Sequence, residues 1–325
     1  MKEKYLVLIF SDNIGNPSKD FNKRGVAGLL HCVNVFLKPL IRIGTILKRK
    51  VVFPLPWICL SISHNKKNEL DKTLNWDSFY NLEDLKNLID LNPPFSFGDN
   101  GSIVTNYSIN FYPSNINLSL INNEIDILAL VNLTNIDYNL KIFSGVTATK
   151  KWNLLSKTEK DSINIIKLYK FKISNDLKVK AQEIINKIKL KNFVFIHIRR
   201  SDFLDNKILA PPDGTRPYTS VEVVSEYIKQ NYDKDRQIII ATNERKYNEY
   251  TDKLKELVDN NLIFEYDFYK VIDQKYIENN YFFYLILSEI ANNAEINVIT
   301  VKLKIGDKYH DSLEEFYYNK FIKNV

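Results

Sequence analysis

The sequence FVFIHIRRSDFL, residues 193–204, is the strongest structural signal in the chain. Its first six residues are apolar except His197, and they end abruptly in Arg199, Arg200 and Asp202. A run that is apolar on both faces predicts a strand buried in a parallel sheet. In open α/β sheets ligands bind just past the carboxyl ends of such strands. We therefore expect His197, Arg199 and Asp202 to lie where a ligand binds.

Adjacent arginines at this point indicate a ligand that carries phosphate, because a planar guanidinium matches two phosphate oxygens at once. Residues of a strand alternate between its two faces, so His197 and Arg199 share a face. Arg200 then faces the other way and is expected to be structural. A simpler interpretation keeps Arg199 and Asp202 as a surface ion pair and His197 as a packed core histidine.

The rest of the second half alternates strands with helices of 10 to 15 residues, which predicts a doubly wound parallel sheet. The expected strands are residues 193–198, 237–241, 263–264 and 296–299. The expected helices are residues 220–231, 244–258, 278–292 and 312–322.

The first half has a similar strand and helix pattern with a long Asn-rich insertion. Strands are expected at residues 5–10, 51–53 and 127–131. Helices are expected at residues 26–47, 82–91, 158–169 and 175–188, and Pro39 should kink or split the first of them. Because 325 residues suffice for two domains of ordinary size, we expect an amino-terminal domain of residues 1–189 and a carboxyl-terminal domain of residues 190–325.

The composition is that of a globular protein, with 45% apolar and 26% charged residues. The net charge of +6 comes mostly from scattered lysines, so nucleic-acid binding is not expected. Cys32 and Cys59 have no metal-binding spacing and are expected to be free, buried thiols. No apolar run is long enough to span a membrane, which predicts a cytoplasmic protein unless a targeting segment has been removed from a secreted one.

Several common catalytic motifs are absent. The chain has no GxGxxG after a strand, no GxxxxGK[ST], no HExxH and no GxSxG, which argues against dehydrogenases, P-loop enzymes, zinc proteases and serine hydrolases. The one Asp-x-Asp pair, Asp233 and Asp235, precedes the strand at 237–241 and lies at the wrong end of it to hold a metal-bound phosphate. We therefore expect no metal ion and no cofactor.

The segment HIRRSDF resembles the signature of the fucosyltransferase superfamily, and further matches resemble the protein O-fucosyltransferases that act on thrombospondin repeats. The supporting matches occur in the order of that family and comprise KDFNKRG (19–25), VVFPLPW (51–57), WDSFYNLEDL (76–85) and IIIATNE (238–244). The resemblance implies the GT-B architecture, an α/β fold in which two Rossmann-like domains face each other across a cleft.

The resemblance also implies metal-independent transfer of fucose from GDP-fucose, with inversion at the sugar carbon. Negative charge builds on the departing diphosphate, and without a metal a fixed guanidinium is its natural stabiliser. Arg199 is the candidate for that catalytic role. His197 would bind the phosphate or the sugar, and Asp202 would orient Arg199 or anchor the loop.

In the amino-terminal loop, the resemblance implies that Phe21 and Asn22 contact the donor. The family has a carboxylate general base just before a Gly-Phe-Asn, whereas this chain has Lys19 at the matching position and Asp20 in place of the glycine. Asp20 then either serves as the base with a one-residue shift or is a solvated loop acid. The acceptor hydroxyl can also lose its proton late, without a base.

Two further segments are implied to bind the donor. Thr242, Asn243 and Glu244 end the strand at 238–242, where the family contacts the nucleotide, although Asn243 is equally suited to cap the next helix. Residues 288–300 replace the family's phosphate loop without its glycine and serines, which leaves Asn297 and Thr300 as candidates.

The acceptor is expected to be a hydroxyl of a protein Ser or Thr, or of a glycan. Trp57 and Trp76 either line an acceptor groove or pack in the core. Two alternatives stay open: a glycan glycosyltransferase that uses another nucleotide sugar, and a sugar-nucleotide-binding protein with impaired catalysis. A slow release of GDP and free fucose would distinguish an enzyme from a binding protein.

Overall fold

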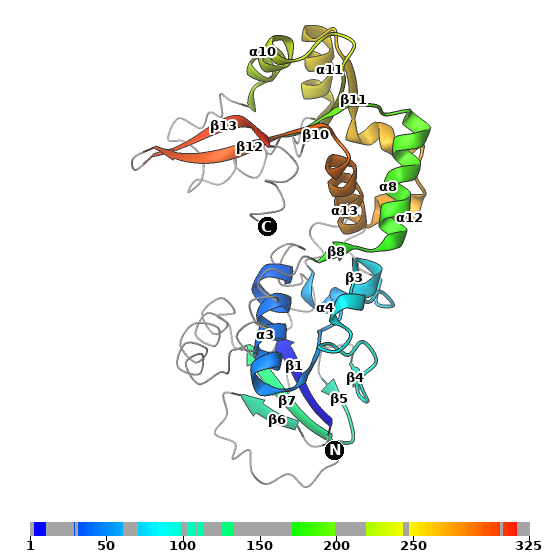
Figure 1. Ribbon diagram of the computed structural model, residues 1–325, viewed down its shortest axis with the longest axis vertical. Helices are drawn as coiled ribbons and strands as arrows, with labels where there is room; N and C mark the ends of the chain where they lie inside the picture. The colour runs from blue at the N-terminus through cyan, green and yellow to red at the C-terminus, as the bar shows by residue number, and fades with distance from the viewer. Residues whose placement is uncertain are drawn as a thin grey trace. The chain divides into compact units, whose positions relative to one another are not determined.

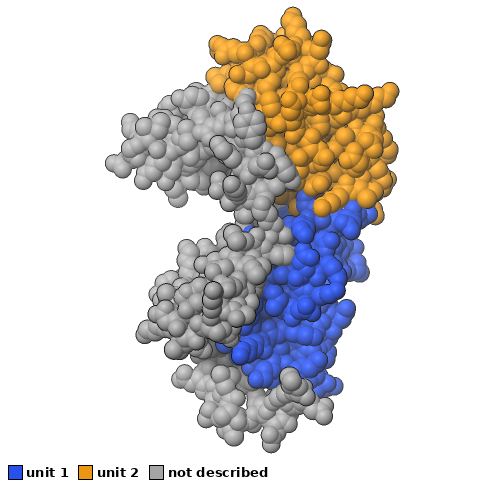
Figure 2. Space-filling view, in the orientation of Figure 1, with its two compact units in different colours: residues 1–176, 278–282 blue, residues 177–277, 283–325 orange. Residues whose placement is uncertain are grey.

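The structure, a computed structural model, describes residues 3–10, 29, 32–60, 71–98, 103–107, 109–112, 125–132, 171–198, 219–242, 247–305 and 308–316. The chain forms two compact units (Figure 2). Unit 1 comprises residues 1–176 and 278–282, and unit 2 comprises residues 177–277 and 283–325. Both units have mixed α/β structure with a mainly parallel sheet.

Unit 1 is organised around a four-stranded sheet in the order β2-β1-β7-β6 (Figure 1). Its strands are β1 (Glu3–Phe10), β2 (Lys50–Val52), β6 (Ile109–Tyr112) and β7 (Ile125–Asn132). All neighbouring strands pair in parallel. Residues 5–9 of β1 are all buried, as expected for a strand covered on both faces.

Between β1 and β2 the chain forms a π-helical segment, η1 (Cys32–Leu37), and then helix α3 (Lys38–Leu47). Pro39 lies in the first turn of α3, directly after the π-helical segment, and Leu37 before it is also helical. The helix thus changes from π to α geometry just before Pro39, and a kink or split at this residue stays a prediction. The short helix α4 (Pro56–Cys59) follows β2, and Cys32 and Cys59 are buried and form no disulfide bond, as predicted.

The helix expected at residues 82–91 is wrong. The structure has only a 3-10 turn there, η4 (Glu83–Leu85). The backbone after the turn forms hydrogen bonds with β2 instead of within a helix. Val51 N donates to Leu88 O, and Asp90 N donates to Val51 O, both at 2.8 Å. A parallel bridge between Val51 and Ile89 completes this pairing. Tertiary pairing thus overrides the helical pattern of apolar residues.

Other short elements complete unit 1 around the insertion. They are η3 (Trp76–Ser78), β3 (Tyr80–Asn81), β4 (Ser96–Phe97), β5 (Ile103–Val104) and β8 (Lys172–Ile173). β3 pairs with β8, and β4 pairs with β5, both antiparallel. The expected helix at residues 158–169 lies outside the described residues.

Unit 2 contains a five-stranded sheet in the order β11-β10-β9-β12-β13. Its strands are β9 (Val194–Ile198), β10 (Gln237–Thr242), β11 (Asn261–Phe264), β12 (Ile296–Ile305) and β13 (Lys308–Phe316). The first four are parallel, and β13 is antiparallel to β12. β9 lies at the centre of the sheet, which confirms the prediction from residues 193–198.

Unit 2 has helices at the expected residues 175–188, 220–231, 244–258 and 278–292, and two short segments that were not expected, helix α12 (Gln274–Glu278) and a 3-10 segment after β11, η7 (Glu265–Lys270). The helices at the expected residues are α8 (Asn175–Ile188), α10 (Val221–Asn231), α11 (Tyr247–Leu257) and α13 (Asn280–Asn292). One core packs alternate residues of β9 and β10, such as Ile196 and Ile240, against Val224 of α10 and Leu254 of α11. None of the described helices has the length and apolar composition needed to cross a lipid bilayer.

The helix expected at residues 312–322 is wrong over the part that the structure describes, because residues 308–316 form β13. β13 pairs with β12 in an antiparallel ladder. Its first pair is Ile305 with Lys308, and its last pair is Asn297 with Phe316. Gly306 and Asp307 stand between the two strands in the sequence, and such dipeptides favour tight hairpins. The hairpin supplies the antiparallel edge strand.

The expected domains, which meet at residues 189 and 190, stay a prediction, and the two compact units divide the chain at another place. Unit 2 begins at Leu177 and so includes nearly all of α8. Contacts with residues beside α12 explain this: Lys187 Nζ donates to Val271 O at 2.9 Å, and Lys180 Nζ lies 3.6 Å from Asp273 Oδ2. Hydrophobic periodicity alone does not tell which sheet a connecting helix packs against.

Candidate functional site

The carboxyl ends of β9 and β10 lie side by side in unit 2, where ligands bind in open α/β sheets. His197 is level with Ala241 of β10 and with Ile299 of β12. Thr242, the last residue of β10, is level with Ile198. The structure therefore brings His197 and Thr242, two of the expected donor-binding residues, to one edge of one sheet.

The environments of these two side chains differ. His197 is partly buried, whereas the neighbouring Ile196 and Ile198 are fully buried. Thr242 is buried with 5% of its surface exposed. His197 is the next-to-last residue of β9, and the polar residues of the segment 199–204 follow the strand in the sequence. A role for either residue in donor binding stays a prediction.

Asn297 lies nearer the amino end of β12, level with Phe195 rather than with His197. Its side chain is 4% exposed, and Nδ2 donates to Ala291 O at 2.9 Å in the last turn of α13. The amide therefore holds the junction between α13 and β12. Thr300 lies farther along β12, where its register partner is Leu313 of β13. Donor contacts of Asn297 and Thr300 stay predictions.

Seven of the expected site residues lie outside the described residues. They are Asp20, Phe21, Asn22, Arg199, Asp202, Asn243 and Glu244.

A buried carboxylate that the sequence analysis did not single out follows β11 at the same edge of the sheet. Phe264, the last residue of β11, is level with Ile240, and Glu265 follows it as the first residue of η7, at the edge toward which β10 continues as Ala241 and Thr242. Glu265 has 9% of its surface exposed, which is low for a glutamate. The signal in the sequence is a Glu-Tyr-Asp directly after the apolar residues 262–264.

Three tyrosines lie around this carboxylate. Burial raises the pKa of Tyr247, Tyr266 and Tyr269, and the nearby negative charge of Glu265 raises each further. All three phenols therefore stay protonated and neutral at physiological pH. Their rings can pack against one another or present a flat, uncharged face.

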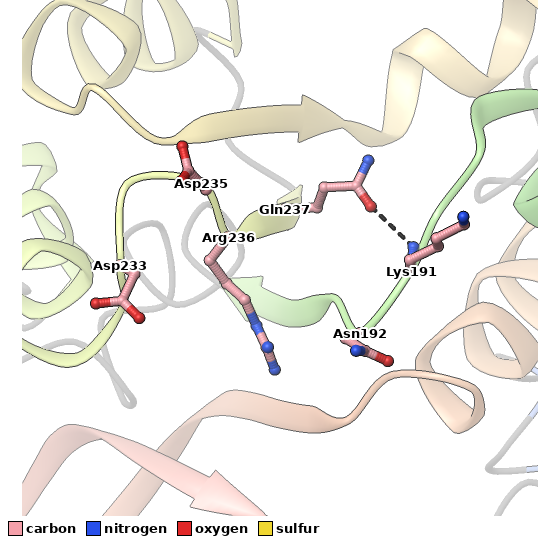
Figure 3. Close-up of a pocket in the computed structure, with 6 residues that line it drawn as sticks. All are labelled: Lys191, Asn192, Asp233, Asp235, Arg236 and Gln237. Carbon is pink, nitrogen blue, oxygen red and sulfur yellow. Dashed lines mark hydrogen bonds between the residues drawn. The ribbon is translucent and has the colours of Figure 1, made fainter.

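The opposite, amino end of β9 and β10 has an open polar pocket of about 580 Å³ (Figure 3). Its lining residues are Lys191, Asn192, Asp233, Asp235, Arg236 and Gln237. Gln237 Oε1 accepts from Lys191 N at 2.8 Å, and Arg236 forms an ion pair with Glu295. The Asp-x-Asp pair thus lies at the edge opposite His197, as expected from its position before the strand.

Metal binding has no candidate in the described residues, which contain no group of three or more His, Cys, Asp or Glu side chains placed to hold an ion. The expectation that no metal is required stays a prediction.

The two tryptophans of unit 1 have different environments. Trp76 is fully buried, and its Nε1 donates to Pro54 O at 2.6 Å. The rings of Phe53 and Phe79 pack against it at centroid distances of 6.4 and 5.9 Å. Trp76 is therefore a core residue. Trp57 is partly exposed, and Lys72 Nζ lies 5.2 Å from its ring centroid. A role for Trp57 in lining an acceptor groove stays a prediction.

Comparisons with known proteins give matches to solved structures alone. No protein-family model matches the sequence, and a search of curated proteins finds no match. The chain is similar to crystal structures of POFUT1 in complex with GDP, with 11% identity, a TM-score of 0.44, and coverage of 92% of this chain and 90% of that chain. It is similar to POFUT1 in complex with GDP-fucose, with 12% identity, a TM-score of 0.45, and coverage of 91% and 90%.

Proposed function

We propose that this chain is a glycosyltransferase that transfers fucose from GDP-fucose to a hydroxyl acceptor, with inversion and without a metal ion. The observation that carries the proposal is the position of HIRRSDF. It starts at His197 in the central strand of a parallel sheet and continues past the carboxyl end of that strand. This is the position at which such sheets bind phosphate-bearing ligands.

The proposed mechanism depends on Arg199. As the bond between the fucose carbon and the diphosphate breaks, negative charge builds on the bridging and β-phosphate oxygens. A guanidinium held beside those oxygens stabilises that charge more in the transition state than in the bound donor, which lowers the barrier. His197 hydrogen-bonds the phosphate or sugar, and Asp202 orients Arg199.

The remaining roles follow the resemblance to fucosyltransferases. Phe21 and Asn22 contact the donor from the amino-terminal loop, and Asp20 removes the proton from the acceptor hydroxyl. Thr242, Asn243 and Glu244 contact the nucleotide, with Asn297 and Thr300 completing the donor site. In this proposal the two units are the two Rossmann-like domains of a GT-B enzyme.

The acceptor is a protein Ser or Thr, or a glycan. A glycan acceptor suits a cytoplasmic chain better, because protein O-fucosylation of this type acts on disulfide-bonded domains in a secretory compartment. The same site would accept another nucleotide sugar if its base and sugar contacts differ from those of the family.

A second candidate is a sugar-nucleotide-binding protein that has lost catalysis. One observation favours it: Asn297, in the segment that replaces the family's phosphate loop, uses its side chain to hold α13 to β12. The lysine at position 19, where the family has its general base, also favours a protein without catalysis.

The proposal is tested by thermal unfolding without a nucleotide and with GDP, UDP, ADP or CDP. A ligand that binds only the native state raises the midpoint of unfolding, and at a fixed concentration a tighter ligand raises it more. We expect GDP alone to raise it. An equal response to all four nucleotides, or to none, contradicts the proposed donor. Release of GDP from GDP-fucose then distinguishes the enzyme from the binding protein.

A further inference from the structure

The carboxyl end of β11 carries a row of aromatic rings that the proposed mechanism does not use. We define the tyrosine row as Tyr247, Tyr266 and Tyr269. The ring centroids of Tyr247 and Tyr266 are 4.1 Å apart, and those of Tyr266 and Tyr269 are 4.8 Å apart. Phe283 of α13 continues the row, with its centroid 5.0 Å from that of Tyr269. Each ring is thus packed against its neighbour.

Tyr266 is the exposed member of the row. It has 41% of its surface exposed, whereas Tyr247 and Tyr269 on its two sides are partly buried. An exposed tyrosine normally samples several rotamers, but a ring held between two others loses that freedom on folding. A flat surface that is already ordered binds a partner ring at a lower entropic cost.

The topology places this row at the ligand-binding edge of the sheet. Tyr247 is the first residue of α11, the helix that follows β10, and Tyr266 is the second residue after β11. Both elements begin where a parallel strand ends, on the edge that also carries His197 and Thr242. The row therefore belongs to the same edge as the proposed phosphate site and lies toward its β11 side.

The spacing of the strands suits a nucleotide. β11 is two strands away from β9, and because neighbouring strands lie about 4.8 Å apart, the two are separated by roughly 10 Å. A nucleoside diphosphate spans a similar length between its base and its terminal phosphate. A phosphate bound beyond β9 thus leaves the base within reach of β11.

We propose that Tyr266 stacks on the base of the nucleotide donor, with Tyr247 and Tyr269 holding its ring in place. This inference rests on the proposed function, since it assumes that the diphosphate binds beyond β9. It assigns base binding to residues outside the motifs on which that function depends. With 41% of its surface exposed, the neutral phenol of Tyr266 offers an aromatic ring on which a base can stack.

The test is calorimetric titration of the full chain with two ligands, GDP and inorganic pyrophosphate. Pyrophosphate has the phosphates but no base. We compare Tyr266→Ala with Tyr266→Phe, which keeps the ring, and with Tyr107→Ala. Tyr107 is a matched control because it is similarly exposed, at 37%, and lies in unit 1.

We expect Tyr266→Ala to weaken GDP binding by about 5-fold to 100-fold, the range that stacking on an aromatic side chain supplies. Its affinity for pyrophosphate should equal that of the wild type, which also shows that the variant is folded. Tyr266→Phe and Tyr107→Ala should bind GDP within about twofold of the wild type.

Two results overturn the inference alone: unchanged GDP affinity in Tyr266→Ala, and an equal loss of GDP and pyrophosphate binding in that variant. A wild-type chain that binds neither ligand overturns the proposed function, and this inference with it.

Discussion

Arg49 and Asp126 form a largely buried ion pair that joins the strands of the unit 1 sheet. Arg49 Nη2 lies 2.8 Å from Asp126 Oδ2, and the two side chains are 10% and 16% exposed. Arg49 Nη1 also donates to the backbone oxygens of Tyr5 and Asp126, at 3.2 and 3.1 Å. One guanidinium thus binds β1 and β7 together from the turn that precedes β2.

Removing one partner of this pair should destabilise the protein strongly. Asp126→Ala leaves the Arg49 guanidinium buried without its counter-charge, and we expect a loss of about 3 to 5 kcal/mol in the free energy of unfolding. Urea unfolding measures it. The matched control is Asp259→Ala, which breaks an exposed pair with Lys234 and should change little. Similar effects of the two substitutions would show that burial does not govern the first.

Gly44 of α3 should not tolerate alanine. A Cβ at this position would lie 2.3 Å from Val51 Cγ2 and 3.0 Å from Arg49 O. Val51 is buried and β-branched, so its side chain cannot easily move away. Overpacking costs about 1 to 3 kcal/mol, which exceeds the gain of about 1 kcal/mol in helix propensity. We expect Gly44→Ala to lower the unfolding midpoint, and a rise would contradict the close contact of α3 with β2. Thr45→Ala in the same helix is the control.

Removing the hydroxyl of Tyr247 should stabilise the protein. This hydroxyl is buried and has no acceptor for its proton among the described residues, although the backbone N–H of Tyr266 interacts with its oxygen. A buried donor without a partner costs about 1 to 3 kcal/mol, so Tyr247→Phe should raise the free energy of unfolding by about 1 kcal/mol. Tyr250→Phe is the matched control with the opposite sign, because the Tyr250 hydroxyl donates to Thr219 O at 2.9 Å. Destabilisation by both substitutions would contradict the difference in hydrogen bonding.

The two buried thiols should make the protein less stable at high pH. Burial raises the pKa of Cys32 from its ordinary value near 9 to about 12, and it raises the pKa of Cys59 well above its ordinary value. Because the folded-state pKa values are higher than those of the unfolded chain, this stability is complete below pH 9 and is lost as the pH rises toward 12. We expect the free energy of unfolding to fall less between pH 8.5 and about 10.5 in Cys32→Ala/Cys59→Ala than in the wild type, measured under reducing conditions. Equal slopes would contradict the raised pKa values.

Arg199→Ala should lower turnover of GDP-fucose by about 10²-fold or more, the scale for removing one preorganised charge donor. The variant should keep the unfolding midpoint of the wild type. Arg236→Ala is the control, since Arg236 pairs with Glu295 at the opposite edge of the sheet and should leave turnover unchanged. Activity should also persist in excess EDTA. Full turnover by Arg199→Ala, or strict dependence on Mn²⁺ or Mg²⁺, would refute the proposed mechanism.

The strands and helices that were predicted correctly are those whose own residues have the apolar spacing typical of the element. β9 follows from a run that is apolar on both faces, and α8 follows from apolar residues at helical spacing, such as Leu177, Ala181 and Ile184. Pro39 marks the start of α3 because its ring fixes the backbone angle locally. The phosphate-binding interpretation of HIRRSDF also comes from neighbouring residues, and it stays a prediction.

The elements that were missed depend on pairing with distant residues. Residues 88–90 have helical spacing, but their backbone hydrogen-bonds to Val51, which is far away in the sequence. Residues 312–316 form a strand because β12 offers them a free edge. Glu265 was overlooked as a site residue because only the register of β11 with β10 shows that it follows β11 at the edge where β10 ends.

From the amino-acid sequence alone follow the α/β class, the central strand β9 and the position of the arginine motif at its carboxyl end. Each of these depends on the order of apolar and charged residues over a few positions. The tertiary structure decided which strands are neighbours, that α8 belongs to unit 2, and that Asn297 is occupied by α13 while Tyr266 remains exposed. Those features depend on hydrogen bonds and packing between residues far apart in the chain, and local periodicity carries no information about them.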